Sequence, residues 1–143
     1  MKVVINDCHG GFGLSTKALD RYIELTGMKL YSHKDDTFGY TSYYYVPYEE
    51  YEKVHKNDMT KTEWEGKEEG LGRYKDSNEL CWSGPRNIKR NDPLLIQVIE
   101  ELGKDANTRY SELKIVEIPD DVEWMVEEYD GAEWIAEKHR TWS

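Results

Sequence analysis

A glycine-rich segment, NDCHGGFGLS over residues 6–15, holds the first residues whose spacing could do chemistry. It follows an apolar run and precedes a segment with helical periodicity, so we expect a loop at a helix N-terminus. Glycines let a backbone approach a ligand closely, and the free N–H groups of a helix start favour an anion. A phosphate-binding loop and a tight strand-to-helix turn both fit. The ligand-binding candidates here are Asn6, Asp7, Gly10, Gly11, Phe12 and Gly13.

The known phosphate motifs differ from this segment. Its glycines stand in the order G-G-x-G, whereas the dinucleotide fingerprint needs G-x-G-x-x-G. No Gly-Lys-Ser/Thr follows, so the segment is not a P-loop. A ligand loop at 6–15 would bind phosphate through its backbone N–H groups.

Two cationic segments could supply further phosphate contacts. Arg86, Lys89 and Arg90 lie within five residues of an otherwise acidic chain, and the C-terminus reads EKHRTW. Guanidinium groups recognise phosphate through paired donors. The alternatives are a solvated loop that balances the acidic surface and a histidine satisfied within the core. We take Arg86, Arg90, His139 and Arg140 as ligand-binding candidates.

Nucleophilic and metal chemistry have weaker support. Cys8 and His9 are neighbours, and neighbours on an extended segment point to opposite faces, so they pair poorly as nucleophile and base. The four histidines are scattered, and neither C-x-x-C nor H-x-x-x-H occurs. We therefore expect no catalytic residue, no metal site and no cofactor.

A tyrosine-rich segment and an acidic segment complete the candidates. Six of the eleven tyrosines lie within residues 37–51, and aromatic faces can stack on nucleobases or pack in a core or oligomer. From Glu112 to Glu137 there are ten acidic residues against one lysine. Such an array could imitate a phosphate backbone, or could simply be a solvated face.

Composition narrows the partners. The chain has 143 residues, 38% of them apolar, and a formal net charge of −10. Non-specific nucleic-acid binding and docking on an anionic membrane both need cations, so neither is expected. No apolar run approaches 18 residues, and the N-terminus has no signal-peptide core. Cys8 and Cys81 are expected to be reduced thiols in a cytoplasm.

Helices and strands must position these residues. Apolar runs predict strands over 2–6, 28–32 and 113–118, with the first of them central in its sheet. Helical periodicity runs from a Ser15 cap to Gly27, and again from an Asp92 cap through Pro93 to Gly103. The polar stretch 55–79 is expected to be a loop-rich insertion.

Asp130-Gly131 is a strong hairpin signal between VEWMVEEY and AEWIAEKHRTW. With those two residues as the turn, Val126 faces Ile135, Glu123 faces Lys138 and Asp121 faces Arg140. The same register sets Glu128 opposite Glu133, which is unfavourable unless a cation lies nearby. A helix over 132–140 is the alternative.

These elements predict an α+β fold. We expect a single domain over 1–143, with an antiparallel or mixed sheet, two main helices on one side and a C-terminal β-hairpin. The hairpin and the strand at 113–118 are expected to form a meander.

Both ends of the chain resemble an uncharacterised family of small proteins encoded by bacteriophages and prophages. The similar stretches are VVINDCHGGFGLS at 3–15, NDPLLIQVIEELG at 91–103 and IVEIPDDVEWMVEEYDGAEWIAEKHRTW at 115–142. The resemblance implies a phage origin and action in the cytoplasm of an infected bacterium. It implies no catalytic residue.

The resulting hypothesis is a non-enzymatic phage counter-defence protein. By analogy of size and context with phage proteins that act as sponges, it would sequester a nucleotide-type host immune signal, such as a cyclic ADP-ribose or a cyclic oligonucleotide. The expected partners are that small phosphorylated ligand and further copies of the chain, with no direct nucleic-acid or membrane contact. One alternative is an acidic inhibitor or nucleic-acid mimic that binds a host defence protein. The other is a small nucleotide-cleaving enzyme.

Overall fold

The structure, a computed structural model, describes residues 1–64, 77 and 79–138. The chain is an α+β protein with a C-terminal β-hairpin, as predicted. It divides into two compact units. The first unit combines Met1–Gly27 with the described residues from Pro85 on, and the second unit is Met28–Gly84.

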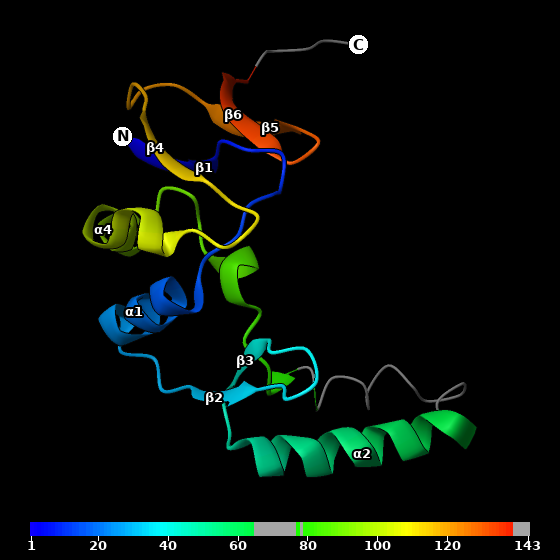
Figure 1. The fold of residues 1–143 in the computed structure, drawn as a ribbon. Helices are drawn as coiled ribbons and strands as arrows, with labels where there is room; N and C mark the ends of the chain where they lie inside the picture. Colours follow the sequence, from blue (N-terminus) through cyan, green and yellow to red (C-terminus); the bar gives the residue numbers. More distant parts are fainter. Residues whose placement is uncertain (65–76, 78, 139–143) are drawn as a thin grey trace. The chain divides into compact units, whose positions relative to one another are not determined.

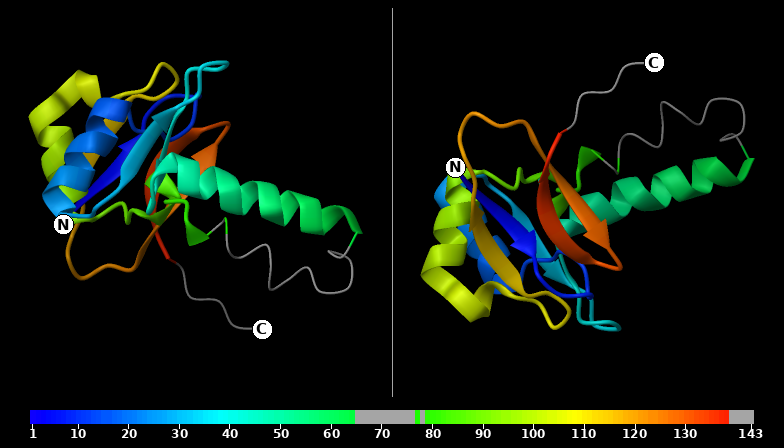
Figure 2. Two further views of the ribbon diagram at one scale, coloured as in Figure 1. Left: turned by 90° about the horizontal axis from the view of Figure 1, so that it is seen from below. Right: turned by 90° about the horizontal axis from the view of Figure 1, so that it is seen from above.

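The first unit is built on strand β1, Lys2–Asn6, which pairs antiparallel with β4, Leu113–Glu117. Helices α1, Thr16–Thr26, and α4, Pro93–Leu102, pack against each other on one side of this pair (Figures 1 and 2). The short 3-10 helices η1, Gly84–Asn87, and η2, Gly103–Ala106, flank α4 in the sequence. The two predicted helices therefore lie on one side of this strand pair, as expected. The prediction did not include the third helix, α2, Tyr48–Trp64, and the expected single sheet is three two-stranded sheets in the described residues.

The ends of both helices follow their predicted signals. The Ser15 hydroxyl accepts a hydrogen bond from the N–H of Ala18, and Gly27 ends α1 in the left-handed conformation. Asp92 caps α4 by accepting from the N–H of Leu94, directly before the proline at the first helical position. Local side-chain chemistry therefore fixes where these helices begin.

The central position expected for β1 is wrong, because among the described residues its sheet has only two strands, β1 and β4. Groups other than a strand occupy the second edge of β1. The N–H of Val4 donates to the carbonyl of Arg90, and the N–H of Asn6 donates to the Glu133 carboxylate. Val3 and Val4 are fully buried. The apolar strand therefore has no free edge toward the hairpin that lies beside it.

The hairpin consists of β5, Trp124–Tyr129, and β6, Ala132–Glu137. Val126 faces Ile135, and the N–H of Lys138 donates to the carbonyl of Glu123, so the predicted register is confirmed. Asp130 and Gly131 both have positive φ, of 50° and 89°, as a two-residue type I′ turn requires. The predicted meander is wrong: β4 pairs with β1 and makes no ladder with β5 in the described residues.

The second unit has its own small sheet. Strand β2, Tyr31–Lys34, pairs antiparallel with β3, Thr41–Tyr44, and helix α2 follows over Tyr48–Trp64. The strand predicted over 28–32 therefore begins three residues later than expected, at Tyr31. A turn that starts at Asp35 sets the register of the two strands. The Asp35 N–H donates to the carbonyl of Tyr40, and the Asp35 carboxylate accepts from the N–H of Thr37.

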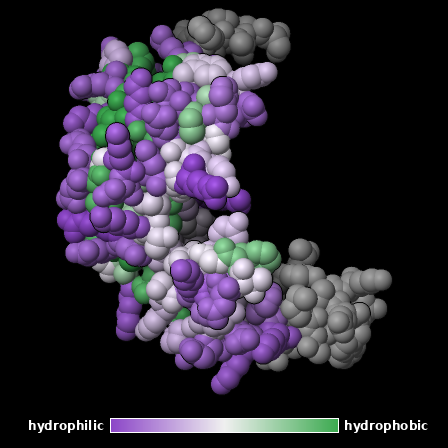
Figure 3. Space-filling model, in the orientation of Figure 1, coloured by the Kyte–Doolittle hydropathy of each residue, from purple (hydrophilic) through white to green (hydrophobic). Residues whose placement is uncertain are grey.

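The loop-rich insertion predicted over 55–79 is wrong for 55–64, which belong to α2. Residues 65–76 and 78 lie outside the described residues. Hydrophilic residues dominate the face of the molecule in Figure 3, as a charged fraction of 34% predicts.

Candidate functional site

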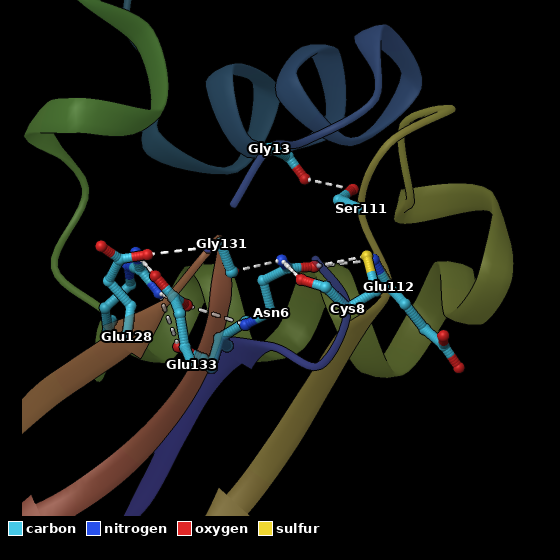
Figure 4. Close-up of polar contacts among 10 residues, drawn as sticks. Asn6, Cys8, Gly13, Ser111, Glu112, Glu128, Gly131 and Glu133 are labelled. Carbon is cyan, nitrogen blue, oxygen red and sulfur yellow. Dashed lines mark hydrogen bonds and ion pairs between the residues drawn. The ribbon is translucent and has the colours of Figure 1, made fainter. Parts of the chain in front are cut away.

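The glycine loop is tied to the rest of the first unit through Asn6. This side chain is fully buried, and its amide nitrogen donates to the carbonyls of Cys8, at 2.6 Å, and Gly131, at 2.8 Å. Its amide oxygen accepts from the N–H of Glu112 at 2.8 Å (Figure 4). Asn6 therefore joins the loop, the residue before β4 and the hairpin turn, and its amide hydrogen bonds are made within the protein.

Two glycines, Gly10 and Gly131, allow the backbone of the loop to pack directly against the backbone of neighbouring segments. A Cβ at Gly10 would lie 1.7 Å from the carbonyl oxygen of Tyr110, and one at Gly131 would lie 2.5 Å from that of His9. Gly11 has φ +94° with open space around it. The loop thus packs between the 108–111 segment and the hairpin turn. Neither Gly10 nor Gly131 leaves room for a side chain at these two contacts.

The remaining loop candidates also make internal contacts. The N–H of Asp7 donates to the carbonyl of Glu112, and the carbonyl of Gly13 accepts from the Ser111 hydroxyl. Cys8 directs its thiol at the carbonyl of Tyr110, 3.3 Å away. These contacts favour the strand-to-helix turn over the ligand loop.

Arg90 is held by an ion pair and by an aromatic ring. Its two terminal nitrogens donate to the two carboxylate oxygens of Glu133, at 2.7 and 2.9 Å. The guanidinium also stacks on the Phe12 ring, with the Arg90 Cζ atom 3.5 Å from the ring centroid. The structure therefore brings Phe12 and Arg90 together. The Arg90 guanidinium is already engaged by the Phe12 ring and by the Glu133 carboxylate.

Glu133 is the second half of this clamp, with 9% of its side chain exposed. Burial alone would raise the pKa of its carboxyl, but hydrogen bonds from Arg90 and from the N–H of Asn6 outweigh burial and lower the pKa. Arg90 is thus the cation that the Glu128–Glu133 register requires. Glu128 itself accepts from the N–H of Gly131.

The other cationic candidates stay predictions. Arg86 is exposed on η1. His139 and Arg140 lie outside the described residues, as does the pairing expected between Asp121 and Arg140.

A pocket in the second unit is the better candidate site. Its volume is about 340 Å³, and its walls come from β2, β3, the turn between them and the first residue of α2. The lining residues are His33, Asp35, Asp36, Thr37, Tyr40, Ser42, Tyr44 and Tyr48.

Aromatic stacking builds one wall of the pocket. The rings of His33 and Tyr48 are parallel within 6°, with their centroids 3.5 Å apart. Tyr44 packs against both Tyr48 and Tyr51 with centroid distances of 5.5 and 4.4 Å. This wall is therefore aromatic. Tyr40, another residue of the lining, is 72% exposed.

Burial governs the tyrosines behind this wall. It raises the pKa of Tyr51 to about 12, and the neighbouring Cys81 adds to the shift. Burial likewise raises the pKa of the Tyr44 hydroxyl and of the Cys81 thiol. The Tyr44 and Tyr51 hydroxyls and the Cys81 thiol are therefore neutral at physiological pH and add no charge beside the pocket.

The sequence left the tyrosine-rich segment open between base stacking and packing in a core or oligomer, and it did not indicate that His33, Asp35 and Tyr48 line one pocket. A signal for α2 was present: Tyr48, Tyr51 and His55 follow Pro47 at helical spacing. The polar composition after His55 concealed it, because α2 is amphipathic only weakly and packs through its first turns.

The described residues contain no cluster of three or more His, Cys, Asp or Glu that could hold a metal ion. In the same ranges, no helix is both long enough and apolar enough to cross a membrane. No protein-family model matches the chain, and comparisons with curated proteins and with solved structures find no match. The resemblance to phage proteins stays a prediction.

Proposed function

We propose that this protein binds a small nucleoside-like ligand in the tyrosine-lined pocket of the second unit and releases it unchanged. The observation that carries the proposal is the pocket itself, about 340 Å³ with the stacked His33 and Tyr48 rings in its wall. Ligand sites typically begin at about 300 Å³ and combine apolar or aromatic walls with a few polar groups.

The polar groups of the lining suit a base and a sugar. Aromatic faces stack on nucleobases with about 1–3 kcal/mol per base. The carboxylate of Asp36 and the hydroxyl of Ser42 can accept hydrogen bonds from amino and hydroxyl groups of a ligand. Asp35 contributes less, because its carboxylate already accepts from the N–H of Thr37.

The charge of the lining selects against phosphate. Among the described residues, the lining of the pocket includes two aspartates and no lysine or arginine. Phosphate groups would therefore lie outside the pocket, and the nucleoside part of the ligand would lie inside. Sequestration of a nucleotide-type host immune signal by a phage is the biological role we propose for this binding.

Titration calorimetry with adenosine, guanosine and cyclic ADP-ribose tests the proposal. We expect heat with at least one of them, and about fivefold weaker binding after Tyr40→Ser, which removes one exposed stacking face. Tyr110→Ser is the matched control, because Tyr110 is 66% exposed, belongs to the first unit and does not line the pocket. Absence of heat for all three compounds contradicts the proposal.

Recovery of the ligand separates binding from catalysis. After incubation and heat denaturation, mass spectrometry should return the added compound intact. A cleaved or transferred product would favour the enzyme alternative instead.

A further inference from the structure

The outer face of the hairpin β5–β6 is a second surface, independent of the pocket. The register pairs Met125 with Ala136, Glu127 with Trp134 and Tyr129 with Ala132. Glu133 contacts Arg90 on the side of β1, so its strand neighbours point the other way. The outer hairpin face therefore consists of Met125, Glu127, Tyr129, Ala132, Trp134 and Ala136.

This face exposes large apolar side chains. Trp134 is 45% exposed, Tyr129 is 73% exposed and Met125 is 39% exposed. Alanines flank Trp134 along β6, so no bulky neighbour on its own strand covers the indole. Exposed aromatic residues gathered on one face mark interaction surfaces more often than chance.

A carboxylate is fixed beside the indole. The Trp134 Nε1–H donates to Glu127 Oε2 at 3.0 Å across the two strands. This bond orients the ring and holds a negative charge at its edge. A carboxylate oxygen can accept further hydrogen bonds, so the pair still offers an acceptor to a partner.

The charge around the face decides between possible occupants. Residues 124–137 contain five acidic residues and no lysine or arginine, and only Glu133 is paired with a described cation. A second copy of the hairpin would bring these carboxylates together and would be repelled. A basic partner would be attracted.

We propose that the outer hairpin face binds an arginine-bearing segment of another protein. A guanidinium can stack on the Trp134 or Tyr129 ring and donate in plane to Glu127. Lysine lacks the planar fork and the stacking surface, so it fits the same face less well. The acidic third of the sequence thereby acquires a defined contact surface, separate from the small-ligand pocket.

Fluorescence anisotropy with a labelled Arg-Ser repeat peptide and its Lys-Ser counterpart tests this. We expect the arginine peptide to bind more tightly. Glu127→Gln and Trp134→Thr should each weaken it by about fivefold or more. Glutamine keeps an acceptor for the Trp134 N–H, so Glu127→Gln leaves the hairpin folded and carries the test even where Trp134→Thr lowers stability.

The control variants are Glu112→Gln and Tyr110→Ser, which remove an exposed carboxylate and an exposed ring from elsewhere in the same unit. The Glu112 carboxylate points away from the loop and hairpin contacts in Figure 4. Both controls should bind within about twofold of the natural protein. Nucleoside binding in the pocket should be unchanged by Trp134→Thr, which separates this proposal from the proposed function.

Three results would overturn the proposal. The first is the absence of binding to the arginine peptide. The second is an equal loss in Glu127→Gln and Glu112→Gln, which would mean that only net charge matters. The third is a dimer, seen by sedimentation velocity, that Trp134→Thr dissociates, since the occupant would then be a second copy.

Discussion

The Arg90–Glu133 pair is the most consequential contact between single side chains in the first unit. It supplies an acceptor to the edge of β1 through the Asn6 N–H and places a cation under the Phe12 ring. Arg90→Met removes the cation and leaves a buried carboxylate unpaired. We expect a loss of about 3 kcal/mol in the free energy of unfolding, measured by urea denaturation.

The double variant Arg90→Met/Glu133→Gln provides the control. It removes both charges and keeps an acceptor for the Asn6 N–H, so it should be more stable than Arg90→Met alone. A single variant within about 0.5 kcal/mol of the natural protein would show that the clamp is energetically unimportant.

The need for a cation beside Glu133 could be predicted from the sequence. The hairpin register showed that Glu128 and Glu133 oppose each other and need a cation, and Arg90 meets that need. The sequence could not show that Arg90 was the partner, because the two residues are 43 positions apart. The role of Asn6 was hidden for the same reason, since its hydrogen bonds reach residues 106 and 125 positions away.

At the scale of elements, the glycine loop and the hairpin turn are docked backbone to backbone. Gly131→Ala imposes a side chain at φ +89° and places its Cβ 2.5 Å from the His9 carbonyl oxygen. Gly11→Ala imposes a similar φ, +94°, in open space. We expect Gly11→Ala to cost about 1–2 kcal/mol and Gly131→Ala to cost about 1 kcal/mol more, measured by thermal and urea unfolding.

The comparison isolates docking from backbone strain, because both glycines share the left-handed conformation. Equal losses for the two variants would mean that the turn does not pack on the loop. Neither variant should change nucleoside binding, since the proposed pocket lies in the other unit.

Elements with strong local signals were predicted well. Caps and apolar periodicity located α1 and α4, and Asp130-Gly131 fixed the hairpin register. Helix α2 was missed because tyrosines favour strands and its later residues are polar, so tertiary packing of Tyr48 and Tyr51 decides its conformation. The pocket includes Tyr48, the first residue of that helix, so missing the helix also hid the pocket.

Across the molecule, one tyrosine with a raised pKa in each unit couples folding to alkaline pH. Burial and the hydrogen bond to Asp92 raise the pKa of Tyr22 to about 12, and burial beside Cys81 raises that of Tyr51 to about 12. Asp92 also caps α4, so the hydrogen bond from the Tyr22 hydroxyl links α1 to the N-terminus of α4.

The sign of the effect follows from these raised values. Below the ordinary tyrosine pKa of 10, both side chains are protonated in the folded and unfolded chains, and their contribution to stability is complete. As the pH rises from 10 toward 12, the unfolded chain loses its protons first, so the free energy of unfolding falls. We expect the melting temperature, followed by circular dichroism from about pH 8 to about pH 11, to decrease over the upper part of that range.

Tyr22→Phe should be less stable at neutral pH, because the hydrogen bond to Asp92 is lost, and its stability should decrease less steeply at alkaline pH. Tyr110→Phe, at an exposed position, should follow the natural protein. An alkaline slope that Tyr22→Phe leaves unchanged would show that the buried hydroxyl is not the group responsible in the first unit.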